Sequence, residues 1–275
     1  MRTPKFAGSF YPSNKELLSK SVNEALNAAE VPAKAVSGAL SYVAPHAGYA
    51  YSGATAGFTY KALLLNKRLE GIETIVVIGP NHTGMGQAIS VSLEDWKTPL
   101  GVSENDRELS KAICGFSDYV SLDEEAHSKE HSIEVQLPFL QLVAPGKKLC
   151  MICMGDQSPE ASRILSDAII NAAKKLKRSI TVIASSDFDH YEPSETAREK
   201  DAQLHNAMKR MDCEKFDSLL HSLNDTACGH GPITVAMVFA KEKGAGKGII
   251  LKYSNSGDQT GDYSSVVAYS SAVFV

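Results

Sequence analysis

The chain has 275 residues and a formal net charge of −4, from 28 Lys and Arg against 32 Asp and Glu. This charge gives no basic footprint for nucleic acid, and no apolar run approaches the roughly 18 residues of a membrane span. Residues 1–5 lack the apolar core of a signal peptide. The five cysteines are odd in number and sparse, which is typical of reduced thiols. We therefore expect a cytoplasmic globular protein with neither nucleic acid nor a membrane as its partner.

Two helices are predicted in the first quarter of the chain. Ser13 and Glu16 have the spacing of a capping box, and apolar residues then recur with a helical period until Pro32 ends the helix. A second helix, rich in small residues, is expected from Ser52 to about Asn66.

Three predicted strands are each followed by polar residues that could carry chemistry. They are 39–44 before His46, 73–79 before Asn81 and His82, and 179–184 before Asp187 and His190. The segment 73–79 is apolar on both faces, as in a fully buried strand. Gly79 and Pro80 then end it.

The rest of the chain alternates helices with strands. Further strands are expected at 87–93, 148–154, 248–253 and 266–275, and helices at 106–114, 160–177, 194–211, 213–223 and 233–240. Another helix is expected to begin at His131, with Pro138 kinking or shortening it. The alternation predicts an α/β fold, a three-layer α/β/α sandwich around a largely parallel mixed sheet whose last strands run antiparallel. With no repeat or linker, we expect a single domain over residues 1–275.

The polar residues after the strands should meet if these strands are parallel, because their carboxyl ends then share one edge of the sheet. Cys228 lies in a Gly/Pro turn before a helix, whose N-terminus would favour the thiolate. Each signal has an ordinary alternative, since a lone loop His is usually a surface or core residue and Asp187 could cap the next segment. Cys228 could be a buried small hydrophobe. From the residues alone, a metal or catalytic cluster and a set of unrelated structural residues are both open.

Several other residues are given weaker interpretations. His205 and His221 lie in polar helices and are assigned no part in a site, whereas the roles of His127 and His230 stay open. Cys150 and Cys153 match the CxxC pattern, but they lie inside an apolar strand, which favours a structural interpretation.

Five motifs give the sequence a resemblance to a known family. They are Pro45-His-Ala-Gly-Tyr49, Gly79-Pro-Asn-His-Thr-Gly84, His131-Ser-Ile-Glu-Val-Gln-Leu-Pro-Phe139, Ser185-Ser-Asp-Phe-Asp-His-Tyr191 and Cys228-Gly-His-Gly-Pro232. Together they resemble the Memo family, and the match extends from 6–12 to 261–263. The resemblance implies the fold of the class III extradiol, LigB-like dioxygenases.

The resemblance also implies a set of site residues. The metal ligands would be His46, His82 and Cys228, and the catalytic pocket residues would be Asp187 and His190. His131, Tyr49, Tyr191 and Asn81 would line the pocket. In the dioxygenases two His and a Glu hold Fe(II), and Cys228 falls at the Glu position. A thiolate is softer and oxidisable, so we expect iron or copper, with zinc as a further option. Asp189 would add a negative charge at the pocket rim.

Three classes of function follow, and whether the chain is an enzyme is left open. The first is a metal-binding protein with redox or dioxygenase-like chemistry on an unknown small substrate, with His190 moving a proton and Asp187 orienting it. The alternative is a non-enzymatic adaptor that binds a peptide or phosphopeptide in the same pocket, although no Arg cluster supports it. A hydrolase with zinc, or with Cys228 as nucleophile, is the third. The resemblance further implies association with AMMECR1-type and radical-SAM proteins.

Overall fold

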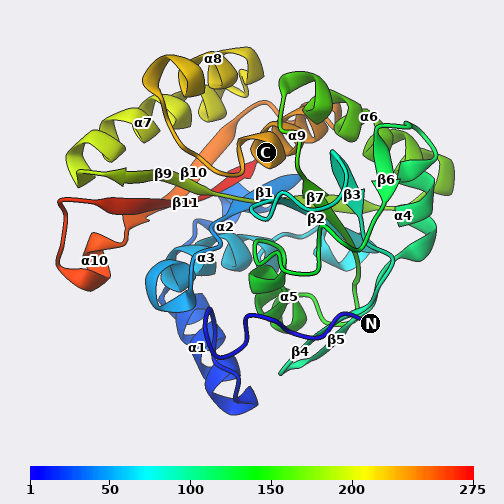
Figure 1. The fold of residues 1–275 in the computed structure, drawn as a ribbon, viewed down its shortest axis with the longest axis horizontal. Helices are drawn as coiled ribbons and strands as arrows, with labels where there is room; N and C mark the ends of the chain where they lie inside the picture. The colour runs from blue at the N-terminus through cyan, green and yellow to red at the C-terminus, as the bar shows by residue number, and fades with distance from the viewer.

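The computed structural model describes residues 1–275 and contains one large sheet and one small hairpin. The large sheet has nine strands: β1 (Ser41–Ala44), β2 (Thr74–Pro80), β3 (Ile89–Val91), β6 (Val120–Leu122), β7 (Lys148–Met154), β8 (Ile180–Ser185), β9 (Asp187–Glu192), β10 (Gly248–Asn255) and β11 (Val266–Phe274). Its order is β10-β11-β1-β8-β2-β7-β3-β6, with β9 paired to β11 (Figure 1). The hairpin consists of β4 (Trp96–Thr98) and β5 (Gly101–Ser103).

The centre of the sheet is parallel and its margins are mixed. Strands β1, β8, β2 and β7 pair in parallel, whereas β11 runs antiparallel to β1, β9 and β10. Strand β3 is also antiparallel to β7, which the sequence did not indicate. The carboxyl ends of β1, β2 and β8 therefore lie along one edge of the sheet.

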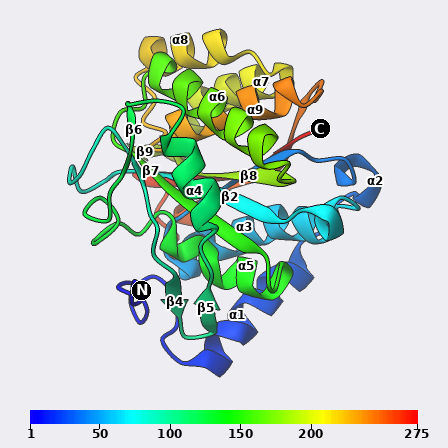
Figure 2. The same ribbon diagram turned by 90° about the vertical axis from the view of Figure 1, so that its right-hand side faces the viewer.

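Helices cover both faces of this sheet, so the predicted three-layer α/β/α sandwich is confirmed. The helices are α1 (Lys15–Ala28), α2 (Ala33–Val36), α3 (Tyr49–Leu64), α4 (Arg107–Cys114), α5 (Leu137–Val143), α6 (Pro159–Leu176), α7 (Ser194–Arg210), α8 (Cys213–Leu223), α9 (His230–Glu242) and α10 (Gly257–Thr260). In both ribbon views α1, α3 and α5 lie on one side and α6, α7, α8 and α9 on the other (Figures 1 and 2).

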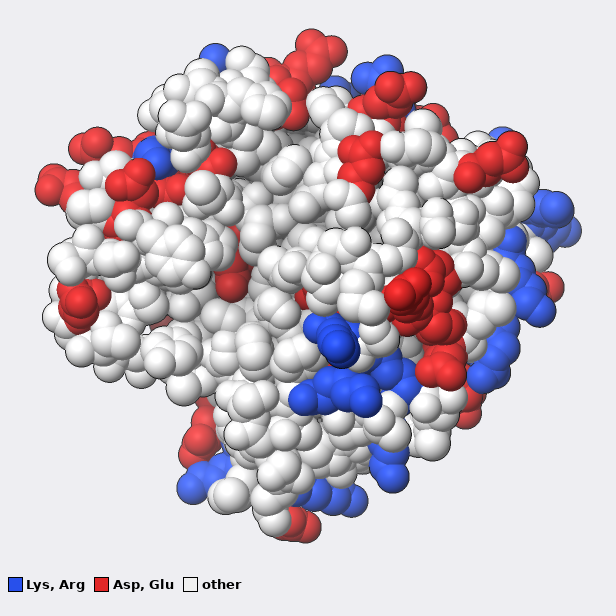
Figure 3. All heavy atoms as spheres, viewed as in Figure 1, with Lys and Arg blue, Asp and Glu red and all other residues white.

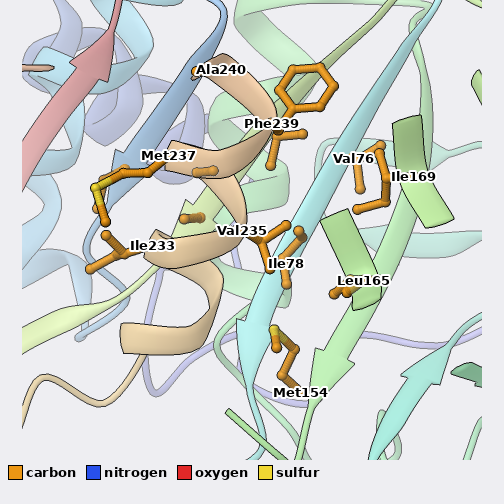
Figure 4. Close-up of a cluster of buried hydrophobic side chains, with 14 of the residues drawn as sticks. Val76, Ile78, Met154, Leu165, Ile169, Ile233, Val235, Met237, Phe239 and Ala240 are labelled. Carbon is orange, nitrogen blue, oxygen red and sulfur yellow. The ribbon is translucent and has the colours of Figure 1, made fainter. Parts of the chain in front are cut away.

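Two hydrophobic cores, one on each face, result from the two-residue period of the strands. Val76 and Ile78 of β2 join the core beneath α6 and α9, where Figure 4 shows them among the side chains of both helices. Ile75 and Val77 point to the core beneath α1, α3 and α5. Every residue of β2 is buried, as the apolar run predicted.

Two expectations about helix starts were wrong. The N-cap of α1 is Asn14 rather than Ser13, because the Asn14 side chain accepts a hydrogen bond from Leu17 N at 2.9 Å. No helix begins at His131, since a 3₁₀ turn covers Glu134–Gln136 and α5 starts after it. Pro138 lies in the first turn of α5, where its missing N–H needs no partner, so it does not act as a kink.

The segment from Asp187 to His190 was expected as a loop but forms strand β9. On β11, only the end of the strand, from Ala272 onward, is paired with β1. The first half of β11 therefore has a free edge, and β9 satisfies its backbone groups, with Tyr269 opposite Asp187.

The face shown in Figure 3 carries both signs of charge. Asp and Glu predominate at its left margin, whereas Lys and Arg are mixed with Asp and Glu along the right margin and gather near the N-terminal segment beside a group of Asp and Glu. Among the helices, none combines the length and the apolar character needed to cross a bilayer.

Candidate metal centre

Three histidines meet at the carboxyl edge of the sheet. His46 follows β1, His82 follows β2, and His131 lies in the segment before α5. One ring nitrogen from each lies within 4.8 Å of the other two. The ring centroids are 5.2 Å apart for His46 and His82, 5.3 Å for His46 and His131, and 4.6 Å for His82 and His131.

Gly79 allows the His131 segment to approach the end of β2. A Cβ at this position would lie 2.3 Å from Ser132 Oγ, closer than any real contact. Ser132 Oγ donates to Pro80 O at 3.0 Å, which ties the segment to the strand end. The glycine therefore permits the backbone contact that brings His131 next to His82.

The tautomer of His46 follows from its neighbours. Ser185 Oγ donates its only proton to Ser132 O at 2.7 Å and accepts from Gln136 Nε2 at 2.8 Å. It can therefore only accept from His46 Nδ1, which lies 2.9 Å away. His46 consequently carries its lone pair on Nε2, the nitrogen that faces Cys228 Sγ at 3.1 Å. A metal-ligating imidazole offers its lone pair in this way while its other nitrogen is held by a hydrogen bond.

Glu130 orients the other two imidazoles and was not identified from the sequence. Its buried Oε1 lies 3.0 Å from His82 Nδ1 and 3.4 Å from His131 Nδ1. Its Oε2 accepts from His82 N at 2.6 Å, and its Oε1 also accepts from the backbone N–H groups of His131 and Ser132. The only sequence signal was a Glu next to a His in a charged loop.

The charge states within this group suit a cation. Burial lowers the pKa of His46 well below its usual range and that of His131 to about 4, so both imidazoles are neutral at pH 7. Burial alone would raise the pKa of Glu130, but the contacts with His82 and the backbone N–H groups lower it to about 2. An ionised carboxylate thus lies behind the neutral imidazole of His131.

Asp187 supports the His46 loop rather than His190. Its Oδ1 accepts from His46 N at 2.7 Å, and no hydrogen bond joins it to the His190 ring. Burial raises its pKa to about 7.

Cys228 lies beside His46, with Sγ 3.1 Å from Nε2, but outside the group of three imidazoles defined above. Its turn packs tightly on β8, because a Cβ at Gly229 would lie 2.3 Å from Ser185 O. The expectation that the N-terminus of α9 would favour the thiolate was wrong. Burial, and then the charge of Asp187, raise the pKa of the thiol well above its usual range.

The residues expected to line the pocket differ in their burial and hydrogen bonds. His190 is partly buried, its Nδ1 has no partner, and burial lowers its pKa. The Tyr49 hydroxyl donates to Val135 O at 2.7 Å within the core beneath α1. The Tyr191 side chain is 79% exposed and its φ is +67°. Asn81 shapes the His82 loop, since its Oδ1 accepts from the backbone N–H groups of Thr83 and Gly84.

Other candidates lie away from the imidazoles. Asp189 was expected at the pocket rim but is fully buried. Its Oδ1 accepts a hydrogen bond from the Thr226 hydroxyl. His127 packs on Trp96, with its Nε2 3.2 Å from Ser90 O. His205 Nε2 lies 2.7 Å from Ser270 Oγ, and His230 is the first residue of α9.

The N-terminal arm, residues 2–11, closes one side of the centre. Buried Glu134 accepts from Arg2 Nη1, from Phe6 N at 2.8 Å and from the Tyr11 hydroxyl at 2.7 Å. The ring of Phe10 lies 4.6 Å from that of His131. Glu134 was also missed from the sequence, because its partners are more than 120 residues away.

Comparison with known proteins agrees with these motifs. The family model described as "Memo-like protein" matches residues 2–273. The chain belongs to the Memo family. It is 42% identical to a MEMO1 family protein of Archaeoglobus fulgidus, with 100% of this chain and 99% of the relative covered. It is 39% identical to one of Nitrosopumilus maritimus, with both chains covered completely.

The fold of this Memo family chain also matches a solved structure. The crystal structure of an uncharacterised protein from Escherichia coli K12 superposes with a TM-score of 0.50 at 13% identity. The match covers 86% of this chain and 99% of the other. At this identity the likeness concerns the fold alone.

The donors at this Memo centre fit a transition metal. They comprise three imidazoles, two of which, His46 and His82, have Nδ1 held at hydrogen-bond distance, and one adjacent sulfur. Imidazole suits zinc, copper and iron, and thiolate favours the softer of these. The three histidines therefore form a possible metal site.

Proposed function

We propose that this chain binds a redox-active metal ion, iron or copper, and uses it for dioxygenase-like or other redox chemistry on a small substrate. His46, His82 and His131 are the imidazole ligands, and Cys228 adds a sulfur ligand on the His46 side. The observation that carries the proposal is the set of three ring nitrogens within 4.8 Å of one another. Zinc fits the same donors and is the runner-up metal.

Each residue has a defined task in this proposal. Glu130 holds His82 and His131 through their Nδ1 atoms, and Ser185 does the same for His46. Asp187 fixes the backbone of His46. The bound ion would supply electron transfer and polarise the substrate.

His190 is the proton carrier in this proposal. Its Nδ1 is free of hydrogen bonds and its lowered pKa keeps the ring neutral at pH 7, so it can accept a proton. Burial, with a smaller contribution from His82, lowers the pKa of His190. The Phe10 ring beside His131 excludes water from that side.

Metal analysis of the purified protein tests the proposal. Protein prepared with and without oxygen should contain about one iron or copper ion per chain, measured by elemental mass spectrometry. His46→Ala and His131→Ala should lose the metal. His221→Ala on the exposed face of α8 should keep it, because its side chain is 80% exposed.

Two results would redirect the interpretation. Stoichiometric zinc with ester or amide hydrolysis would favour the hydrolytic alternative. No metal under any loading, together with tight phosphopeptide binding, would favour the adaptor. If the metal is iron, oxygen uptake with catechols and related dihydroxy aromatics would identify the reaction class.

A further inference from the structure

Thr226 joins the two chain segments that carry Cys228 and His190. Its Oγ1 accepts a hydrogen bond from His190 N at 2.7 Å and donates to Asp189 Oδ1 at 3.0 Å. Thr226 N also donates to Asp189 Oδ1, at 3.2 Å. One hydroxyl therefore links strand β9 to the turn that holds the thiol two residues further on.

Asp189 is a rigid anchor for this link. It is fully buried, its backbone N donates to Asp201 Oδ1 at 3.2 Å, and its Oδ2 lies 3.5 Å from Lys200 Nζ. Lys200 Nζ also donates to Asn224 O at 3.3 Å, at the start of the same turn. Helix α7 thus supports both the strand and the turn.

The far side of the turn is fixed independently. Gln157 Nε2 donates to Cys228 O at 2.8 Å, and Ser186 Oγ accepts from Gly229 N at 2.9 Å. These contacts restrain the backbone after the thiol but do not involve His190. Of the side chains that hold the turn, Thr226 is the one that also bonds to His190.

We propose that Thr226 is a positioning residue that holds the Cys228 thiol and the His190 imidazole at one fixed separation. Its importance for catalysis rests on the function proposed above, but the restraint itself exists without a metal. Loss of the hydroxyl should free both His190 N and one bond to Asp189, so the thiol and the imidazole should become mobile together.

A pair of substitutions separates the hydroxyl from the shape of the side chain. Thr226→Val keeps the volume but removes the hydrogen bonds, whereas Thr226→Ser restores the hydroxyl. Thr260→Val on α10 is a matched control, because that Thr also makes local hydrogen bonds, to Asp262. All variants are studied in the full-length, metal-free protein, with circular dichroism confirming the fold.

Alkylation of Cys228 by iodoacetamide, followed by peptide mass spectrometry, measures the mobility of the thiol. Partly buried Cys114 on α4 is the internal reference. Thr226→Val should raise the Cys228 rate roughly three- to tenfold, the factor expected for a lost hydrogen bond. Thr226→Ser and Thr260→Val should stay within about twofold. The His190 imidazole resonances should shift in Thr226→Val alone.

An unchanged Cys228 rate or unmoved His190 resonances in Thr226→Val would overturn the proposal. Equal effects of Val and Ser would also overturn it, because shape rather than the hydroxyl would then matter. A wild-type protein that binds no metal would remove the proposed function and leave these outcomes interpretable. If metal binds, Thr226→Val should weaken its affinity and Thr226→Ser should restore it.

Discussion

The two halves of the candidate metal centre are held by different contacts. The imidazole half, His82 and His131, rests on the buried carboxylate of Glu130, and the arm that covers it rests on Glu134. In the thiol half, Cys228 and His190 are bonded directly by neutral groups and by close backbone packing at Gly229, and the buried Asp189–Lys200 pair acts on them through Thr226. Direct contacts with a buried charge are strong but costly restraints, whereas neutral hydrogen bonds are individually weaker. A single substitution in the imidazole half should therefore cause a large loss of stability or metal affinity, whereas one in the thiol half should cause a smaller loss.

The largest expected effect is on the imidazole half. Glu134→Gln leaves Arg2, which is 6% exposed, without its buried counter-charge. We expect a loss of about 3 kcal/mol in the free energy of unfolding, measured by urea denaturation. Glu24→Gln, which removes an exposed ion pair with Lys20, should change it by less than about 0.5 kcal/mol. Equal stabilities would mean that the arm is not held by charge.

The pH dependence of metal affinity distinguishes the halves directly. The raised pKa keeps the Cys228 thiol protonated near neutral pH, so a metal that binds sulfur must displace a proton. Affinity should therefore rise about tenfold per pH unit above about pH 7. The lowered pKa values of His46 and His131 mean that neither adds to this slope. Cys228→Ser should abolish the slope in competition titrations, and an unchanged slope would exclude sulfur ligation.

Glu130→Gln tests whether the carboxylate of Glu130 orients the imidazoles of His82 and His131. The amide lacks the charge that holds both Nδ1–H groups, so metal affinity should fall about 10- to 100-fold by calorimetry. Glu125→Gln, at an exposed position in the same segment, is the control. Retained affinity in Glu130→Gln would show that the imidazoles are oriented by packing alone.

The last comparison concerns the turn of the thiol half. Gly229→Ala places a methyl group against Ser185 O and should cost about 1–3 kcal/mol in thermal or urea unfolding. Gly246→Ala has nothing within 4 Å of the added carbon and should be nearly neutral. Full stability of Gly229→Ala would show that the turn adjusts freely, contrary to the close packing seen here.

The sequence predicted the parts of the molecule that depend on local pattern. The sequence predicted the apolar run of β2, its end at Gly79 and Pro80, and the position of His82 just after it. A buried strand and the residues that end it have a recognisable local pattern. The strand β9 was missed because its partner, β11, lies more than 70 residues further along the chain. Glu130 and Glu134 were missed for the same reason, since a carboxylate in a charged loop or in the first turn of an expected helix looks exposed until the fold buries it.

By itself the sequence determined the layered α/β architecture and the residues that could bind a metal, through periodicity, chain breakers and the five motifs. Only the tertiary structure decided which donors gather and in what state of charge. It placed His131 beside His46 and His82, turned their Nδ1 atoms toward Ser185 and Glu130, and kept Cys228 protonated. The physical reason is that tautomer, pKa and ligand spacing depend on burial and on neighbours brought from distant segments, which no local pattern encodes.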